Sequence, residues 1–266
     1  KLKQLETRNL QFFENIVSFY NEIGINIFIT NKKIDDKTFF RRIKKKNYDE
    51  FVDDKFLINS KKDTSEIQNK ETKIRELEYL FKNFDSCGLK KTSTNFVKFI
   101  GNINSKIIII DSPPDIEEDR TGISFISAKG ELLEKMLNAI KLTTNDVFIV
   151  KSIPWRPPGN RYPTLEEIKI CRPFIINLIN LIEPKIIVCL GEVPINQILE
   201  LDQSILKLRG KWRSLQSKKT YGFDGLNHQI SVLSTLSISH LLERPDLKKF
   251  AWEDMKLLRD KIKEIS

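Results

Sequence analysis

The chain has 266 residues, with 45 Lys and Arg against 36 Asp and Glu, which gives a formal net charge of +9 and a pI near 9.3. Hydrophobic residues make up 40% of it, enough for a buried core, which excludes a disordered or collagen-like chain. No apolar run approaches the ~18 residues of a membrane-spanning helix, and three scattered cysteines do not suit a disulfide-stapled secreted module. We therefore expect a cytoplasmic protein with no membrane partner, whose basic charge weakly favours a polyanion.

The N-terminal part predicts a helix followed by a linker. Apolar residues recur at helical spacing over 9–24, and Gly24 follows as a helix stop. We expect a helical segment at 1–30 and, because 31–70 is rich in Lys, Asp and Asn without periodicity, a polar linker there. A second predicted helix, at 71–84, opens the main domain.

The main domain, 71–266, alternates strand patterns with helical patterns. Four β-branched runs predict strands that are buried on both faces of a parallel sheet: 106–110, 147–153, 185–190 and 229–233. Helical patterns lie at 130–141, from Thr164 onward with a capping box to Glu167, and at 246–264. The alternation predicts an α/β fold of three layers, α/β/α, in which the central layer is a mostly parallel four-stranded sheet.

Ligands of such sheets bind beyond the carboxyl ends of the strands. The most specific segment there is 155–161, of sequence WRPPGNR, in which two prolines and a glycine stiffen a loop. The loop carries Arg156, Asn160 and Arg161, and arginine presents forked donors that suit phosphate oxygens. From composition alone, the other interpretation is a proline-rich surface turn whose arginines pair with nearby acids.

Five blocks occur in order along the main domain. They contain 85–89 with Thr92; Glu118, Asp119, Gly122 and Phe125 with the helical pattern at 130–137; 155–161 with Glu167 and Cys171; 208–212; and Leu241, Leu242, Pro245, Trp252 and Asp254. Together they resemble the motifs of family-four uracil-DNA glycosylases, the iron–sulfur branch of the uracil-DNA glycosylase superfamily, over about 85–266. The helix at 9–24 is similar to the N-terminal extension of the α-proteobacterial branch. The resemblance implies the uracil-DNA glycosylase fold, DNA as partner, base-excision repair and association with the nucleoid.

The residues at the family's reaction centre differ here. The family holds a catalytic carboxylate in a Gly-Glu-Ala-Pro-Gly turn, which serves the attacking water and the sugar cation. Aligned on that turn, 111–115 reads DSPPD, so Ser112 takes the carboxylate position and Asp111 and Asp115 replace two glycines. The histidine that donates to the departing uracil aligns with Ser237.

The base-binding positions are only partly kept. The family's base-reading asparagine aligns with Lys151, and an ammonium can only donate hydrogen bonds. The ring on which a flipped base stacks is retained as Phe125, whereas the glycine two residues later is Ser127.

The family commonly binds a [4Fe-4S] cluster through four cysteines. The matching positions hold Phe84, Cys87, Trp155 and Cys171, so two thiolates remain, too few for such a cluster. We expect Phe84 and Trp155 to fill its volume, and we expect no metal and no cofactor.

Three functional hypotheses follow. The first is a DNA-binding protein without efficient uracil excision, with Phe125 and Lys151 in a vestigial base pocket and a backbone-contacting set made of Arg156, Asn160, Arg161, Arg209 and Lys211. The second is an active glycosylase, for uracil or another deaminated base, in which Asp111 or Asp115 replaces the lost carboxylate. The third is a non-DNA interaction module that docks a repair or replication protein through the N-terminal helix. Product formation separates the second from the first, and salt-dependent DNA binding separates both from the third.

Overall fold

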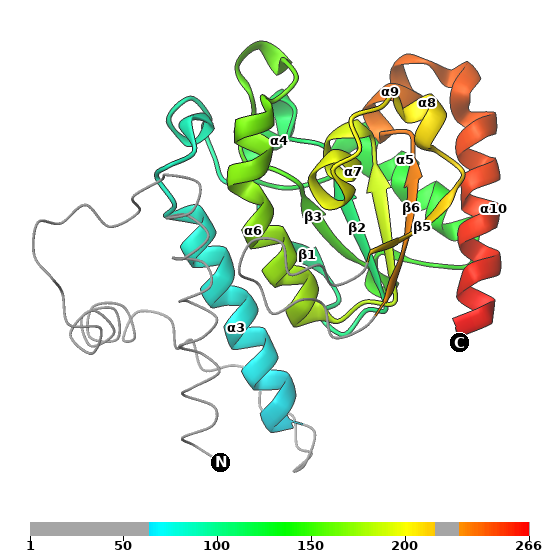
Figure 1. The fold of residues 1–266 in the computed structure, drawn as a ribbon, viewed down its shortest axis with the longest axis horizontal. Coiled ribbons are helices and arrows are strands. Elements are labelled where there is room, and N and C mark those ends of the chain that lie inside the picture. Colours follow the sequence, from blue (N-terminus) through cyan, green and yellow to red (C-terminus); the bar gives the residue numbers. More distant parts are fainter. Residues whose placement is uncertain (1–63, 216–228, 266) are drawn as a thin grey trace, which may run out of the picture.

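A computed structural model of the chain (Figure 1) describes residues 64–215 and 229–265. The expected helix at 9–24 and most of the expected linker lie outside these residues. No helix in the described ranges is both long and apolar enough to cross a membrane.

In the described part of the chain, six strands form one sheet in the order β1-β3-β2-β4-β6-β5. Their bounds are β1 Ile100–Gly101, β2 Ile107–Asp111, β3 Phe148–Lys151, β4 Ile186–Leu190, β5 Trp212–Leu215 and β6 Ile230–Thr235. The four predicted strands are the parallel centre, β3-β2-β4-β6, and β2, β3 and β4 are buried at every position. Two antiparallel edge strands, β1 and β5, were not predicted.

Helices cover the sheet on its two sides. Their bounds are α3 Thr64–Lys82, α4 Ile116–Thr121, α5 Ser127–Asn138, α6 Leu165–Ile182, α7 Glu192–Leu199, α8 Ile205–Leu208, α9 Ile238–Glu243 and α10 Lys248–Ile265. Short 3-10 turns lie at η1 Gly88–Lys91, η2 Thr144–Asp146, η3 Pro158–Asn160 and η4 Pro245–Leu247. Helix α3 packs against α6, and α10 packs against β6; Figure 1 shows α6 and α10 on opposite sides of the sheet. The sequence therefore predicted the α/β class and its layers correctly.

The start of α3 corrects the expected linker boundary. The helix begins at Thr64, so 64–70 is helical rather than part of the polar linker. The segment contains Glu, Gln and Lys, which are good helix formers. Its last residue also makes a tertiary contact, since Lys70 Nζ donates to the carbonyl oxygen of Ile182 at 3.1 Å.

The predicted start of α6 is confirmed and fixes the loop that follows β3. The Thr164 hydroxyl accepts from the amide of Glu167 at 3.2 Å, and the Glu167 carboxylate accepts from the amide of Thr164 at 2.7 Å. This capping box satisfies amides that a helix N-terminus leaves unpaired. The segment between β3 and α6 is therefore anchored at both ends.

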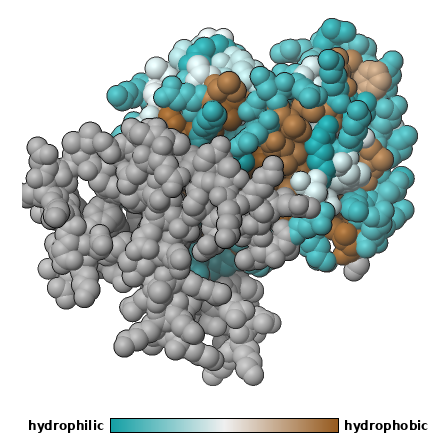
Figure 2. Space-filling model, in the orientation of Figure 1, coloured by the Kyte–Doolittle hydropathy of each residue, from teal (hydrophilic) through white to brown (hydrophobic). Residues whose placement is uncertain are grey.

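The loops after β2, β3, β4 and β6 leave the sheet at one end, because parallel strands share their direction. Figure 1 shows α4, α7, α8 and α9 gathered there. In Figure 2, the described residues on the visible face are largely hydrophilic, with apolar patches between them. The residues that follow the strands form the candidate site.

Candidate active site at the carboxyl ends of the strands

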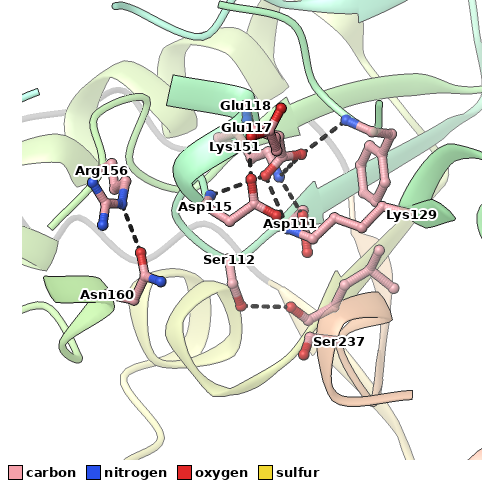
Figure 3. A network of polar contacts seen from close by, with 12 residues as sticks. Asp111, Ser112, Asp115, Glu117, Glu118, Lys129, Lys151, Arg156, Asn160 and Ser237 are labelled. Atoms are coloured by element: carbon pink, nitrogen blue, oxygen red, sulfur yellow. Dashed lines mark hydrogen bonds and ion pairs between the residues drawn. The ribbon is translucent and has the colours of Figure 1, made fainter. Parts of the chain in front are cut away.

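Figure 3 shows Ser112 and Ser237 near each other at this end of the sheet, and both lie beside Gly191. The Ser112 hydroxyl, just after β2, donates to the carbonyl oxygen of Leu190 at 2.9 Å. Ser237 caps α9 by accepting the amide of His240. A Cβ on Gly191 would lie 2.7 Å from Ser112 Oγ and 3.3 Å from Ser237 Cβ, and the φ of +99° there favours glycine. The two positions that the resemblance assigns to the catalytic carboxylate and histidine thus meet in space, both as serine.

A buried ion-pair network lies next to the serines. Asp111 ends β2 and Lys151 ends β3, and the parallel register pairs them. Lys151 Nζ lies 2.6 Å from Asp111 Oδ2 and 2.6 Å from Glu118 Oε1. The same nitrogen sits 4.7 Å from the centroid of the Phe125 ring, within cation–π range. All four residues are buried.

A second lysine closes the network from α5. Lys129 Nζ lies 3.0 Å from Glu118 Oε2 and 2.7 Å from Asp115 Oδ2. Asp115 caps α4: its carboxylate accepts the amide of Glu118 at 2.9 Å, and its own amide donates to Glu118 Oε2 at 3.2 Å. Figure 3 shows the lysines and carboxylates converging in this way. Both oxygens of Glu118 are therefore used inside the protein.

The pKa values of the two buried carboxylates in the network, Glu118 and Asp111, shift in opposite directions. Burial acts to raise the pKa of Glu118, but the charges of Lys151 and Lys129 outweigh it, so this pKa lies below its usual range. Burial raises the pKa of Asp111, because loss of hydration outweighs the attraction of Lys151. Of these two buried carboxylates, Glu118 is therefore the one that stays ionised, and Asp111 is the one that takes up a proton more readily.

Glu118 also fixes the backbone of Phe125. The Phe125 amide donates to Glu118 Oε1 at 2.8 Å, and Phe125 and Ser127 have φ values of +54° and +53°. Non-glycine residues with such φ values cost on the order of 1–3 kcal/mol, and Ser127 stands where the resemblance has glycine. A Cβ on Gly130 would lie 2.2 Å from the Phe125 carbonyl oxygen, so the turn into α5 is tightly packed. The Phe125 side chain is held in a buried position, with Lys151 over its ring.

The loop after β3 holds its two arginines differently. Arg156 Nε donates to Asn160 Oδ1 at 2.6 Å (Figure 3). Arg161 makes a bidentate pair with Glu167, at 2.6 and 2.9 Å, and donates to the carbonyl oxygen of Tyr162. The loop therefore combines both sequence interpretations: Arg161 is paired with an acid, as in a surface turn, and Arg156 is ordered by the exposed Asn160.

Arg209 and Lys211, which precede β5, differ in burial and in their partners. The Arg209 guanidinium makes a bidentate pair with the buried Asp254, at 2.7 and 3.0 Å, and donates to the carbonyl oxygen of Phe250. Asp254 in turn accepts from the hydroxyl of Thr235 at 2.6 Å. Arg209 thus attaches this loop to α10 and β6, whereas Lys211 is exposed.

Sequence comparison identifies the family to which this fold and site belong. Residues 99–256 match the profile of the uracil DNA glycosylase superfamily. The chain belongs to this superfamily. It is 32% identical over 174 residues to the type-4 uracil-DNA glycosylase of Archaeoglobus fulgidus (64% of this chain, 83% of that protein) and 32% identical over 189 residues to that of Thermotoga maritima (69% and 91%). The corresponding enzyme of Sulfurisphaera tokodaii is 34% identical over 179 residues (65% and 78%). The predicted membership of the uracil-DNA glycosylase superfamily, with similarity to its type-4 enzymes, is confirmed.

The residues at the expected cluster positions of the superfamily's iron–sulfur branch do not fit a four-cysteine cluster. Cys87 and Cys171 are both buried free thiols. Trp155 packs edge-on against Phe81, with ring centroids 5.3 Å apart, and Phe84 is a buried ring as well. Within 64–215 and 229–265, no group of three or more His, Cys, Asp or Glu side chains could hold a metal ion. Two thiols are too few to hold a [4Fe-4S] cluster in the family's four-cysteine manner.

Sequence reasoning missed the roles of Glu118 and Lys129. The sequence places Glu118 in a block that resembles a uracil-DNA glycosylase motif, but it does not indicate the partners of that carboxylate. Lys129 carried a usable signal, because it precedes the buried Leu133 and Leu137 by four and eight residues on one face of α5. A lysine in line with a buried apolar stripe indicates a buried anionic partner, and here the partners are Glu118 and Asp115.

Proposed function

We propose that this protein binds DNA through the uracil-DNA glycosylase fold and excises uracil little or not at all. The observation that carries the proposal is the meeting of Ser112 and Ser237 beside Gly191, at the two positions where the resemblance expects charged or strongly donating groups. Such a protein would act in or beside base-excision repair and would associate with the nucleoid.

The chemistry of excision explains why these serines matter. Cleaving the bond between sugar and base develops positive charge on the sugar and negative charge on the departing base, after the nucleotide is flipped out of the duplex. A fixed carboxylate stabilises the first charge and a positioned donor stabilises the second. The Ser112 hydroxyl has no charge and its proton is donated to the carbonyl oxygen of Leu190. Ser237 is engaged as the cap of α9.

The two loops that support DNA binding lie at opposite sides of the same sheet end. Arg156 and Asn160 follow β3, and Lys211 precedes β5. Four strand spacings separate β3 from β5 in the sheet order, or about 19 Å at ~4.8 Å per spacing. Basic side chains that far apart would contact the phosphate backbone at two separate points. Arg161 and Arg209 would support these loops rather than contact phosphates directly.

A second candidate is an active glycosylase that uses Asp115 as its carboxylate. One observation favours it: the Asp115 side chain is 36% exposed, whereas that of Asp111 is 6% exposed and paired with Lys151. Asp115 is also held at a helix start, which would keep it oriented. Its pairing with Lys129 would have to be relieved for it to serve a water or a sugar cation.

Two measurements on the full chain test the proposal. Binding to a uracil duplex and to its thymine control is followed by fluorescence anisotropy over a salt series, and single-turnover excision is measured on uracil and hypoxanthine duplexes. We expect equal, salt-dependent binding to both duplexes and no abasic product. Lys211→Ala should weaken binding to both duplexes and reduce the salt slope by about one, whereas Lys135→Ala, at a 75% exposed site on α5, should change neither.

Two outcomes would contradict the proposal. Abasic product from the unmodified protein, lost in Asp115→Asn, would establish the second candidate instead. Absence of salt-dependent binding would reject DNA as the partner and would favour an interaction module, whose expected N-terminal helix lies outside the described residues.

A further inference from the structure

We propose that Lys151 is a specificity-determining residue that keeps bases out of the site, because its ammonium occupies the ring face on which a base would stack. This inference rests on the proposed function, since it concerns a base offered by bound DNA. It assigns the failure to accept a base to one buried cation and the two carboxylates that hold it, Asp111 and Glu118.

The Lys151 ammonium lies over the ring on which a base would stack. The Lys151 side chain is 0% exposed, and its nitrogen is 2.6 Å from each of two carboxylates and 4.7 Å from the Phe125 ring centroid. A base needs an open aromatic face to stack on, but the Phe125 residue is only 9% exposed. A neutral base would have to displace an ammonium from two buried carboxylates without supplying a charge to replace it, which is strongly unfavourable.

Regular secondary structure fixes the position of this cation. One Asp–Lys pair, Asp111 with Lys151, is set by the register of adjacent strands. The other, Asp115 with Lys129, is set by the capping box of α4. Both lysines converge on Glu118, which is 0% exposed and binds one lysine with each oxygen. The network therefore does not depend on a mobile surface side chain.

The aspartates and lysines of the network depend on one another. By the resemblance, Asp111 and Asp115 stand at glycine positions and Lys151 stands at an amide position. In the fold each aspartate contacts a lysine, so the buried Asp111 and the half-buried Asp115 each have a cation beside them. Because removing one member of a buried pair leaves the other uncompensated, these residues act together. Opening the site thus requires removing opposite charges at the same time.

Lysine acylation tests the occupancy directly. The native full chain is treated with a water-soluble acetylating ester, and the labelling rate of each lysine is followed by mass spectrometry. We expect Lys151 to react more slowly than the exposed Lys135 by about tenfold or more, because its reaction requires local opening. Labelling of Lys151 at a rate similar to that of Lys135 would overturn the proposal, and this experiment needs no variant.

Two matched variants test how the cation is held. Asp111→Asn should speed the labelling of Lys151 more than that of Lys129, and Asp115→Asn should do the reverse. Asp260→Asn, which removes an exposed carboxylate paired with Arg259, should leave both rates unchanged. Equal effects of the two network variants on both lysines would show that the pairs do not act as described.

A charge-balanced double variant tests the consequence for bases. Asp111→Gly with Lys151→Asn removes one negative and one positive charge, and we expect it to bind a uracil duplex about tenfold more tightly than the thymine control, as the amide can donate and accept. No discrimination by the double variant, or discrimination already present in the unmodified protein, would overturn the role of Lys151. Failure of the proposed function is distinguishable, because it would abolish salt-dependent binding to both duplexes while leaving the labelling pattern intact.

Discussion

Asp111 and Lys151 are register partners at the ends of two adjacent parallel strands, and their charged groups meet 2.6 Å apart inside the protein. In open α/β sheets this end of the strands is where ligands bind. Here the same place holds an internal ion pair, joined by Glu118. The sheet thus retains the geometry of a binding site, but the side chains of Asp111, Lys151 and Glu118 occupy part of that site.

Replacing Lys151 by methionine should destabilise the fold by about 3–5 kcal/mol, because the buried Asp111 loses its cation and the buried Glu118 keeps only Lys129. Methionine keeps a similar length, so loss of packing contributes little. Urea unfolding measures the difference in the free energy of unfolding. The matched control is Lys135→Met, at a 75% exposed site 3.8 Å from Glu131, which should cost less than about 1 kcal/mol. Equal effects of the two variants would mean that the buried pairing contributes nothing measurable.

Acid should destabilise the protein through Glu118. Burial opposes ionisation, but Lys151 and Lys129 outweigh it and hold the pKa of Glu118 below its usual range. A carboxyl with a lower pKa in the folded state stabilises the fold above its unfolded pKa and loses that contribution as pH falls. We expect the free energy of unfolding to drop as pH decreases below about 4.3, the ordinary glutamate value. Glu118→Gln should be less stable at neutral pH and less dependent on acid.

Asp111 should act with the opposite sign. Burial raises its pKa, so the folded state binds its proton more tightly than the unfolded state does. Ionisation of Asp111 therefore opposes folding as pH rises above about 3.9, the ordinary aspartate value. Urea unfolding between about pH 3 and pH 7, for Glu118→Gln and for Asp111→Asn, should show changes of slope in opposite directions. Slopes that match those of the unmodified protein would contradict this assignment.

The central strands could be predicted because each is an apolar β-branched run buried on both faces. The edge strands could not, since β1 has two residues and β5 has a mixed burial pattern, so pairing with a neighbour rather than composition defines them. The capping box of α6 could be predicted because its two residues are three apart in the sequence.

The ion-pair network was beyond sequence reasoning for a related reason. Asp111 and Lys151 are forty positions apart, and their contact depends on which strands are neighbours and in what register. Local sequence patterns specify neither the strand order nor the register. For the same reason, the sequence predicts that Arg209 contacts phosphate, whereas in the fold its guanidinium forms an ion pair with Asp254 on α10.

Arg209→Ala should therefore affect stability more than it affects DNA contact. It leaves Asp254, which is 0% exposed, without its bidentate partner, and a loss of about 3–5 kcal/mol is expected for such a pair. Urea unfolding of Arg209→Ala and of Lys211→Ala compares the two residues, with the exposed Lys211 expected to cost less than about 0.5 kcal/mol. If Arg209→Ala instead leaves stability intact and flattens the salt slope of DNA binding, Arg209 contacts phosphate.

Purified protein should be colourless. Two of the four family cluster positions are the buried rings Phe84 and Trp155, so a [4Fe-4S] cluster would lack half of its thiolates. The iron content and the visible absorbance spectrum of protein prepared without oxygen show whether a cluster is bound. The double variant Cys87→Ser with Cys171→Ser is the control and should give the same spectrum. A brown protein with about four irons per chain would contradict the expectation.

Efficient uracil excision should require the Asp111–Lys151 pair to be replaced together with the two serines. Ser112→Glu supplies a carboxylate for the sugar side, and Ser237→His supplies a donor for the departing base, a contribution of about 3–4 kcal/mol when preorganised. Alone, each should remain near background, because groups that act as a unit are not additive. Adding Lys151→Asn without Asp111→Gly would leave Asp111 and Glu118 buried with no ammonium between them, at the cost of stability. We therefore expect detectable single-turnover release of uracil only when all four changes are combined, and substantial release by either serine variant alone would show that the native pocket already admits the base.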